Sequence, residues 1–204
     1  MTRAFAALTG VPDAFAGLRF AGRTDRWIAQ QAASAAGVVL HEALFVAFAA
    51  AYADELRATL ATQPCSALPG AAALLAALCA RDAHADPALG VATGNLRATA
   101  ALKIAHAGLD AYLPHDRGGY GDDHADRPDV LRAAVAACDW PAHARVIVIG
   151  DSEHDITAAR AIGATAVGVA TGARTQRELR DAGATATLPD LRDTAAALRL
   201  LLDV

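Results

Sequence analysis

The sequence predicts an α/β protein with a Rossmann-like, three-layer core of parallel strands and a small helical cap. Beyond about residue 67, short apolar runs alternate with helical segments, which is typical of a parallel sheet covered by helices on both faces. The residues before about 60 show helical spacing of apolar side chains and no convincing strand. Polar side chains directly follow the apolar runs, at the strand ends where such sheets bind ligands.

The first part of the chain is expected to be all-helical. Apolar side chains recur at spacings of three and four in "TDRWIAQQAASAA" and "HEALFVAFAAAYADELRATLA". The apolar run 43–53 is too short to cross a bilayer, which takes about 20 residues, and predicts a buried helix. The stretch 62–70, "TQPCSALPG", has the composition of a linker. These features predict a helical cap domain at 1–66 and an α/β core at 67–204.

The core elements are expected in regular alternation, with a Gly- and Asp-rich loop between the second and third helices. Strands are expected at 89–93, 146–150, 165–170 and 184–188. Helices are expected at 71–82, 95–109, 128–138, 155–164, 175–183 and from Leu191.

Composition excludes several classes of function. The net charge is −4 and no long basic run is present, so the sequence predicts neither a nucleic-acid partner nor an anionic membrane surface as partner. Three widely spaced cysteines without a C-x-x-C pair argue against a disulfide scaffold or a zinc site. With no signal-peptide pattern, we expect a reduced, cytoplasmic protein. The oligomeric state stays open.

Two acids follow the apolar run "VIVIG". Gly150 allows a tight exit from the strand, and Asp151 and Asp155 lie about one helical turn apart. Acids so placed suit a hard cation such as Mg²⁺, which takes oxygen ligands and bridges to phosphate. Equally, Asp151 or Ser152 could cap the helix, with Asp155 as a first-turn acid favoured by the helix dipole.

The segment "TGN" follows the strand expected at 89–93. Thr93, Gly94 and Asn95 offer a hydroxyl and free backbone amides at a helix start, which together can cradle a phosphate. The alternative is an ordinary helix N-cap with a permissive glycine.

A cation is available at the next helix start. Arg127 precedes Pro128, which favours an extended residue before it and a helix after it, so the guanidinium can be held at the mouth of the sheet. The alternative is a solvated loop arginine. Lys103 is the rival cation, although inside its helix it would more naturally extend to solvent. Arg19, Arg23 and Arg26 could meet a substrate carboxylate from the cap.

With its order of Thr93, Arg127 and the G-D-x-x-x-D of Gly150, Asp151 and Asp155, the sequence resembles the haloacid dehalogenase (HAD) superfamily of phosphohydrolases, in its phosphoglycolate-phosphatase-like branch. The resemblance implies that Thr93 binds a phosphoryl oxygen and that Arg127 neutralises the phosphate. It implies Asp151 and Asp155 as the Mg²⁺ site, and "GRTD" at 22–25 as part of a helical cap.

The family's Asp-x-Asp nucleophile motif is not found in this sequence. In the family that motif ends a strand in the middle of the sheet, between the strands that carry "VATG" and "VIVIGD". Losing it would leave a gap of about 10 Å with unpaired backbone groups. A mis-set or truncated start, a rearranged sheet that binds without turnover, or a strand supplied in trans could each explain this.

The resemblance therefore implies a Mg²⁺-dependent phosphatase acting on a small phosphate monoester, a phosphorylated metabolite similar to phosphoglycolate. Thr93, Gly94, Asn95 and Arg127 would bind the substrate. Because the attacking acid is missing, little or no turnover is expected from this chain. The alternative is a non-catalytic phosphate-binding or interaction protein on a decayed scaffold of the same family.

Overall fold

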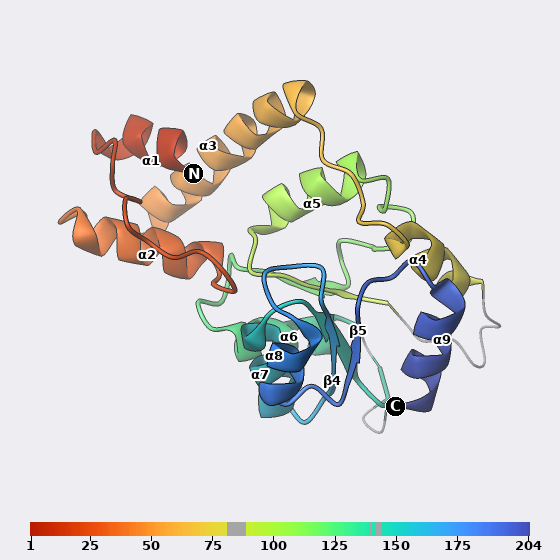
Figure 1. The fold of residues 1–204 in the computed structure, drawn as a ribbon. Coiled ribbons are helices and arrows are strands. Elements are labelled where there is room, and N and C mark those ends of the chain that lie inside the picture. The colour runs from red at the N-terminus through yellow and green to blue at the C-terminus, as the bar shows by residue number, and fades with distance from the viewer. Residues whose placement is uncertain (81–88, 139, 142–143) are drawn as a thin grey trace.

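The chain begins with three helices that pack together (Figure 1). The computed structural model describes residues 1–80, 89–138, 140–141 and 144–204. The three helices are α1 (Thr2–Thr9), α2 (Asp25–Ala35) and α3 (Glu42–Thr62). The predicted all-helical start is therefore confirmed, and the stretch 63–70 is neither helix nor strand.

Aromatic side chains form the centre of this helical part. Phe48 of α3 is fully buried and packs edge-on against Phe5, with 5.9 Å between the ring centroids. Phe15, from the segment between α1 and α2, stands 5.4 Å from Phe5. On the other face of α3, Val46 is 59% exposed. The expectation of a buried helix at 43–53 is thus half right, because α3 buries one side only.

The remaining chain alternates helices with parallel strands, which confirms the predicted α/β core. All strand pairs in the described residues are parallel. The strands are β1 (Val91–Ala92), β2 (Gly118–Gly119), β3 (Ile147–Gly150), β4 (Thr165–Val169) and β5 (Ala186–Leu188). The helices are α4 (Ala71–Cys79), α5 (Arg97–His106), α6 (Arg127–Ala137), α7 (Glu153–Ala161), α8 (Gln176–Asp181) and α9 (Thr194–Asp203).

Helices cover both faces of the strands, as a three-layer arrangement requires (Figure 1). Val167 of β4 packs with α4 and α9 on one face, while its neighbour Ala166 packs with α6, α7 and α8 on the other. Successive strand residues point to opposite faces, so a strand covered on both sides is apolar throughout. None of the helices in the described residues is long and apolar enough to cross a membrane.

One strand lies where the sequence predicted a loop. β2 consists of Gly118 and Gly119, both buried, and pairs with β1 in the register Val91 to Gly118. A Cβ atom on Gly119 would collide with the carbonyl oxygen of Val130, because α6 lies directly against the strand backbone. Glycine is rare in strands and gave no strand signal, yet only glycine fits this close approach.

The strands form two separate sheets in the described part of the chain. β1 pairs only with β2, and the second sheet has the order β3-β4-β5. No ladder joins β1 to β3 across the position where the sequence analysis placed a gap. The gap is therefore neither filled by another described strand nor closed by direct pairing of its two edges.

Buried polar contacts attach the helical part to the core. The hydroxyl of Thr24 accepts from the amide of Trp27 at the start of α2 and donates to the carbonyl of Ala125 at 2.7 Å. The amide of Asp25 donates to the carbonyl of Gly94 at 2.6 Å. Leu96, which follows β1, is buried among the apolar residues of the helical part. The two parts therefore share both polar and apolar contacts.

We predict that Phe48→Ala destabilises the protein by about 3 to 5 kcal/mol, because it leaves a cavity at the centre of the aromatic cluster. Val46→Ala, two residues earlier in α3 and largely exposed, should change the free energy of unfolding by less than about 0.5 kcal/mol. Urea unfolding followed by circular dichroism measures both. Equal effects for the two variants would contradict the packing described here.

Candidate active site

The six residues singled out in the sequence line one cavity. It has a volume of about 380 Å³ and lies where the helical part meets the core, beyond the carboxyl ends of β1 and β3. Its wall includes Thr93, Gly94, Asn95, Arg127, Asp151 and Asp155. The geometry therefore brings these residues together, and their chemical roles follow from their individual contacts.

Asp155 is held by its own helix start. The hydroxyl of Ser152 accepts from the amide of Asp155 at 3.2 Å, while the Asp155 carboxylate accepts from the amide of Ser152 at 3.3 Å. This reciprocal arrangement is a capping box, so the alternative that Ser152 caps the helix, with Asp155 in its first turn, is correct for these two residues. Gly150 makes it possible, because a Cβ atom at that position would collide with the side chain of Asp155.

Arg127 forms an ion pair with Asp155. Its Nε and Nη2 atoms both donate to Oδ1 of Asp155, at 3.0 and 2.6 Å. Asp155 is only 7% exposed, and its second oxygen accepts from the Ser152 hydroxyl at 2.7 Å. Arg127 is the first residue of α6 and is not a solvated loop arginine. Both oxygens of Asp155 are therefore engaged, and its contacts serve to position Arg127.

Asp151 differs from Asp155 because its carboxylate has no side-chain partner among the described residues. Partial burial, and then the negative charge of Asp155, raise the pKa of Asp151 above its ordinary value. A positive ion at this carboxylate would relieve both effects. The structure thus leaves one carboxylate open to a ligand just after the end of β3.

The described residues contain no group of three or more His, Cys, Asp or Glu side chains that could hold a metal ion. Mg²⁺ does not need such a group, because it commonly keeps several waters and binds through one or two carboxylates together with substrate phosphate. Asp151 therefore fits Mg²⁺ as a single carboxylate ligand. Asp155 fits the expected ligand role less well, since Arg127 and Ser152 occupy its oxygens.

The loop after β1 directs a hydroxyl donor into the cavity. The Oγ1 atom of Thr93 accepts from both nitrogens of Asn95, the amide at 3.2 Å and Nδ2 at 2.8 Å. A hydroxyl has two acceptor positions and one donor, so its O–H remains to donate elsewhere. The N-cap of α5 is Leu96, and the alternative that this segment is an ordinary helix cap does not apply to Thr93.

The first amides of α5 are not available to a ligand. The amide of Leu96 donates to Asp25 at 3.0 Å, and the amide of Arg97 donates to Asp122 at 2.8 Å. The expected cradle of free helix amides is therefore smaller than the sequence suggested. Gly94 lies against the guanidinium of Arg127, because a Cβ atom there would stand 3.2 Å from Nη1.

Lys103 also lines the cavity, although the sequence favoured an orientation toward solvent. Its Nζ donates to Oδ1 of Asn95. Lys103 lies six residues into α5, about two turns from the helix start, so its long side chain runs back along the helix toward the strand end. Lys103 and Arg127 therefore both border the site from the core, and the choice between them as the phosphate-binding cation remains a prediction.

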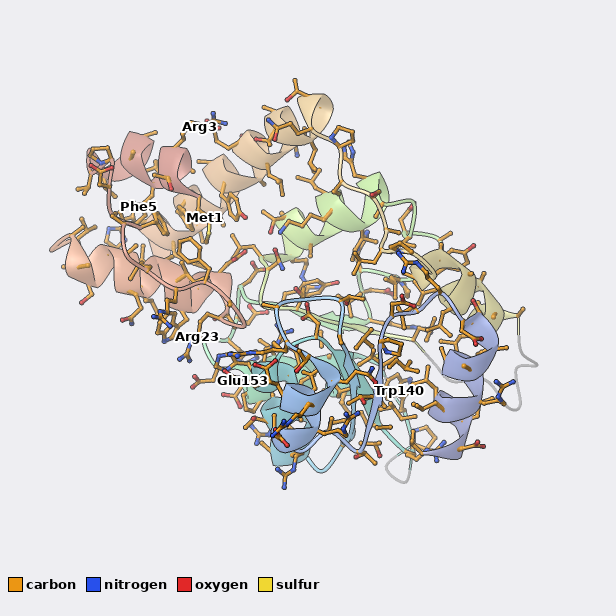
Figure 2. All side chains as sticks on the ribbon, viewed as in Figure 1. Met1, Arg3, Phe5, Arg23, Trp140 and Glu153 are labelled. Atoms are coloured by element: carbon orange, nitrogen blue, oxygen red, sulfur yellow. The ribbon has the colours of Figure 1, made fainter. Side chains whose placement is uncertain are left out.

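The helical part contributes Asp25 and Tyr52, which the sequence did not single out, and Arg23, one of the three arginines considered for a substrate carboxylate. Asp25 is 7% exposed and burial raises its pKa. Burial, and then the charge of Asp25, raise the pKa of Tyr52 to about 12. The guanidinium carbon of Arg23 lies 4.6 Å from the centroid of the Trp27 ring. Arg23 also lines the cavity, where the helical part meets the core (Figure 2). The only signal for Asp25 was its place after Thr24 in "GRTD".

A helical part over a parallel α/β core, with an acid, a hydroxyl and a cation at its strand ends, defines a capped α/β hydrolase. A family model for haloacid dehalogenase-like hydrolases matches residues 2–163, and the chain belongs to this family. The resemblance to the haloacid dehalogenase family is thus confirmed, while the phosphoglycolate-phosphatase-like branch and the absence of the nucleophile motif stay predictions. No curated protein is similar enough in sequence to match this chain.

Solved structures show the same fold at low identity. A hydrolase from Pseudomonas syringae is 24% identical, with 98% of this chain and 92% of the other covered and a TM-score of 0.62. A haloacid dehalogenase-like protein of unknown function from Agrobacterium tumefaciens is 23% identical, with 98% and 90% covered and a TM-score of 0.55. A HAD family hydrolase from Deinococcus radiodurans, with bound phosphate and sodium, is 23% identical, with 98% and 87% covered and a TM-score of 0.50.

We predict that Asp151→Asn makes the folded protein slightly more stable at pH 7. Because the folded-state pKa of Asp151 is raised, its stabilising contribution is complete below the unfolded value of 3.8 and is lost as the pH rises through the folded pKa. The asparagine removes this loss. The gain should be at most about 0.5 kcal/mol, because water screens a partly exposed charge.

Thermal unfolding of both proteins between pH 4 and pH 8 measures this effect. The difference in melting temperature should grow as the pH rises and shrink toward pH 4. Glu153→Gln serves as a matched control, since its exposed side chain pairs with Arg174 and makes the same charge change. A difference that grows toward acid pH would contradict the stated cause.

Proposed function

We propose that the cavity is the phosphate site of a Mg²⁺-dependent phosphomonoesterase of the HAD family, which takes a small phosphate monoester such as a phosphoglycolate-like metabolite. The observation that carries the proposal is the grouping of Thr93, Arg127 and Asp151 around one cavity at neighbouring strand ends. Each of the three offers a chemically distinct contact to a phosphate or to its counter-ion. Membership of the family and the phosphate bound in the Deinococcus radiodurans relative support it.

The contacts support a separate role for each residue in this proposal. Arg127 uses Nε and Nη2 for Asp155, which leaves Nη1, beside Gly94, to bind a phosphoryl oxygen and neutralise its charge. The O–H of Thr93 donates to a second oxygen. Asp151 would hold Mg²⁺, which supplies charge neutralisation for the phosphoryl group when it is bound. Asp155 holds Arg127 in place and so acts through it.

This chain alone is proposed to bind the ester with little or no turnover. Hydrolysis through a covalent intermediate needs a carboxylate that is free to attack phosphorus. Among the acids that line the cavity, Asp155 is paired with Arg127 and Asp25 accepts from the amide of Leu96. Asp151 is the open carboxylate, and binding Mg²⁺ engages it. No further acid of the described residues lines the cavity.

A non-catalytic phosphate-binding protein is the second candidate function. The separation of β1 from β3 favours it, because no continuous sheet in the described part of the chain joins the two strand ends that carry the site. A phosphatase assay with p-nitrophenyl phosphate, with and without Mg²⁺, can decide for the enzyme but not for the binder, because little or no turnover is expected of this chain under either function. Turnover that requires Mg²⁺ and is lost in Asp151→Asn would establish the enzyme. Turnover that survives Asp151→Asn would remove the proposed mechanism.

We predict that Arg127→Lys weakens the binding of inorganic phosphate by about tenfold, while the charge beside Asp155 is kept. The lysine ammonium cannot hold Asp155 and reach the ligand with separate donors, as a guanidinium can. Isothermal titration calorimetry measures the affinity. Arg132→Lys, on the exposed side of the same helix and paired with Asp129, is the matched control and should bind normally.

Lys103→Met belongs to the same experiment, because it tests the rival cation. Its effect should be smaller than that of Arg127→Lys, since Asn95 already occupies its ammonium group. A larger loss in Lys103→Met than in Arg127→Lys would assign the phosphate-binding role to Lys103. No phosphate binding by the unaltered protein, with or without Mg²⁺, would contradict the proposed function itself.

We predict that Mg²⁺ raises the melting temperature of the protein and that Asp151→Asn abolishes the rise. A ligand that binds only the folded state stabilises it by an amount that grows with its concentration. Thermal unfolding over a Mg²⁺ titration measures this without any need for turnover. Glu153→Gln should respond to Mg²⁺ as the unaltered protein does. An equal rise in Asp151→Asn would place the ion elsewhere.

A further inference from the structure

The side chains of Lys103, Asn95 and Thr93 form a chain of hydrogen bonds along one wall of the cavity. The Nζ atom of Lys103 donates to Oδ1 of Asn95, and Nδ2 of Asn95 donates to Oγ1 of Thr93 at 2.8 Å. The backbone amide of Asn95 donates to the same Oγ1 atom at 3.2 Å. Lys103 is therefore connected through Asn95 to the hydroxyl of Thr93.

The lysine ammonium determines the direction of the hydrogen bonds in this chain. An ammonium group carries donors only, so the oxygen of the Asn95 carboxamide faces Lys103 and its NH₂ group faces Thr93. The Thr93 oxygen then accepts twice from Asn95, and its own O–H has to donate elsewhere. With the carboxamide reversed, Oδ1 would accept the O–H of Thr93. The orientation of one carboxamide therefore decides whether Thr93 offers a donor to the cavity.

The backbone around Asn95 is fixed by other contacts, so the carboxamide is the group that can turn. The amide of Thr93 donates to the carbonyl of Gly119 in β2 at 3.1 Å, and the carbonyl of Asn95 accepts from the amide of Gly121 at 2.8 Å. Neither contact involves the carboxamide. Its two orientations have nearly the same shape, because they only exchange an oxygen for a nitrogen. Packing alone therefore distinguishes them poorly, whereas the charge of Lys103 distinguishes them well.

The helical part favours the inward orientation of Lys103. Asp25 of α2 lines the same cavity, and its carboxylate accepts from the amide of Leu96 at 3.0 Å. Burial raises the pKa of Asp25, and the positive charge of Lys103 opposes this rise, so the two charges lie close enough to interact. Their attraction holds the lysine on the cavity side, where Asn95 accepts from it.

We propose that Lys103 is a positioning residue, which orients the carboxamide of Asn95 and thereby directs the O–H of Thr93 into the cavity. Lys103 then acts on a ligand through Thr93 and is not itself the phosphate-binding cation, a role that falls to Arg127. The benefit to phosphate binding rests on the proposed function. The orientation of Asn95 is a property of the ligand-free protein and does not.

The composition of the chain allows a direct test, because Asn95 is its single asparagine and Lys103 its single lysine. Cell-free synthesis with nitrogen-15-labelled asparagine gives one pair of side-chain amide signals in an NMR spectrum. Thr93→Val removes the acceptor of Nδ2 and should move these signals. Without any phosphate, Lys103→Met should move them in the same direction, because the carboxamide can then turn. Lys103→Arg keeps a cation with donors only and should leave them nearly in place.

Phosphate binding measures what this orientation contributes to the ligand. In isothermal titration calorimetry with inorganic phosphate, Thr93→Val should weaken binding about tenfold and Lys103→Met about fivefold. Combined with Thr93→Val, Lys103→Met should add little further loss, because the hydroxyl through which it acts is gone. If Lys103 bound the phosphate directly, the two losses would multiply. Circular dichroism establishes that the variants are folded, and Lys103→Gln replaces Lys103→Met if the latter is not.

Two results would overturn the proposal. The first is a ligand-free Asn95 signal that is the same in Lys103→Met as in the unaltered protein, since the carboxamide would then keep its orientation without the ammonium. The second is a pair of losses that multiply, which would assign direct phosphate binding to Lys103. If the unaltered protein binds no phosphate, the proposed function fails, and the ligand-free spectra still decide whether Lys103 orients Asn95.

Discussion

The ion pair between Arg127 and Asp155 is the contact on which the rest of the site depends. It joins the first residue of α6 to the first turn of α7, and these helices follow two different strands. Both partners are largely withdrawn from water, with side-chain exposures of 20% and 9%. A buried charge without its partner is strongly unfavourable, so each residue holds the other in one orientation. The end of β3 and the start of α6 are thereby fixed together, and the cavity takes its shape from this connection.

The sequence predicted the fold well where the hydrophobic pattern is regular. The strands at 147–150 and 165–169 came from apolar runs, and the flanking helices from three and four spacing. β2 could not be found in this way, because Gly118 and Gly119 have no side chains to form a pattern. Glycine is required at Gly119 because α6 lies directly against the backbone of β2. The local sequence pattern does not show this contact.

In the candidate site, too, some residues could be identified from the local sequence, whereas others depend on contacts between distant segments. Thr93, Arg127 and Asp151 were identifiable because each directly follows or begins a regular element. The contacts of Asp155 and Lys103 could not be predicted from the sequence, because they depend on which partner the fold places opposite each side chain. Asp25 was missed for the same reason, because its importance arises from the amide of Leu96, about seventy residues away in the chain. Spacing within a motif predicts proximity, whereas hydrogen-bond partners require the tertiary structure.

The attachment of the helical part has a consequence for how this protein can be divided. The stretch 63–70 looks like a boundary between two modules, and shuffling or separate expression would naturally cut there. Yet Asp25 and Thr24 of the helical part form hydrogen bonds with the backbone of the core, at Leu96 and Ala125. Leu96 in turn is buried among the apolar residues of the helical part. Cutting the chain there would remove hydrogen-bond partners and apolar contacts from both fragments. The two parts therefore form one structural unit, although a linker-like stretch joins them in the sequence.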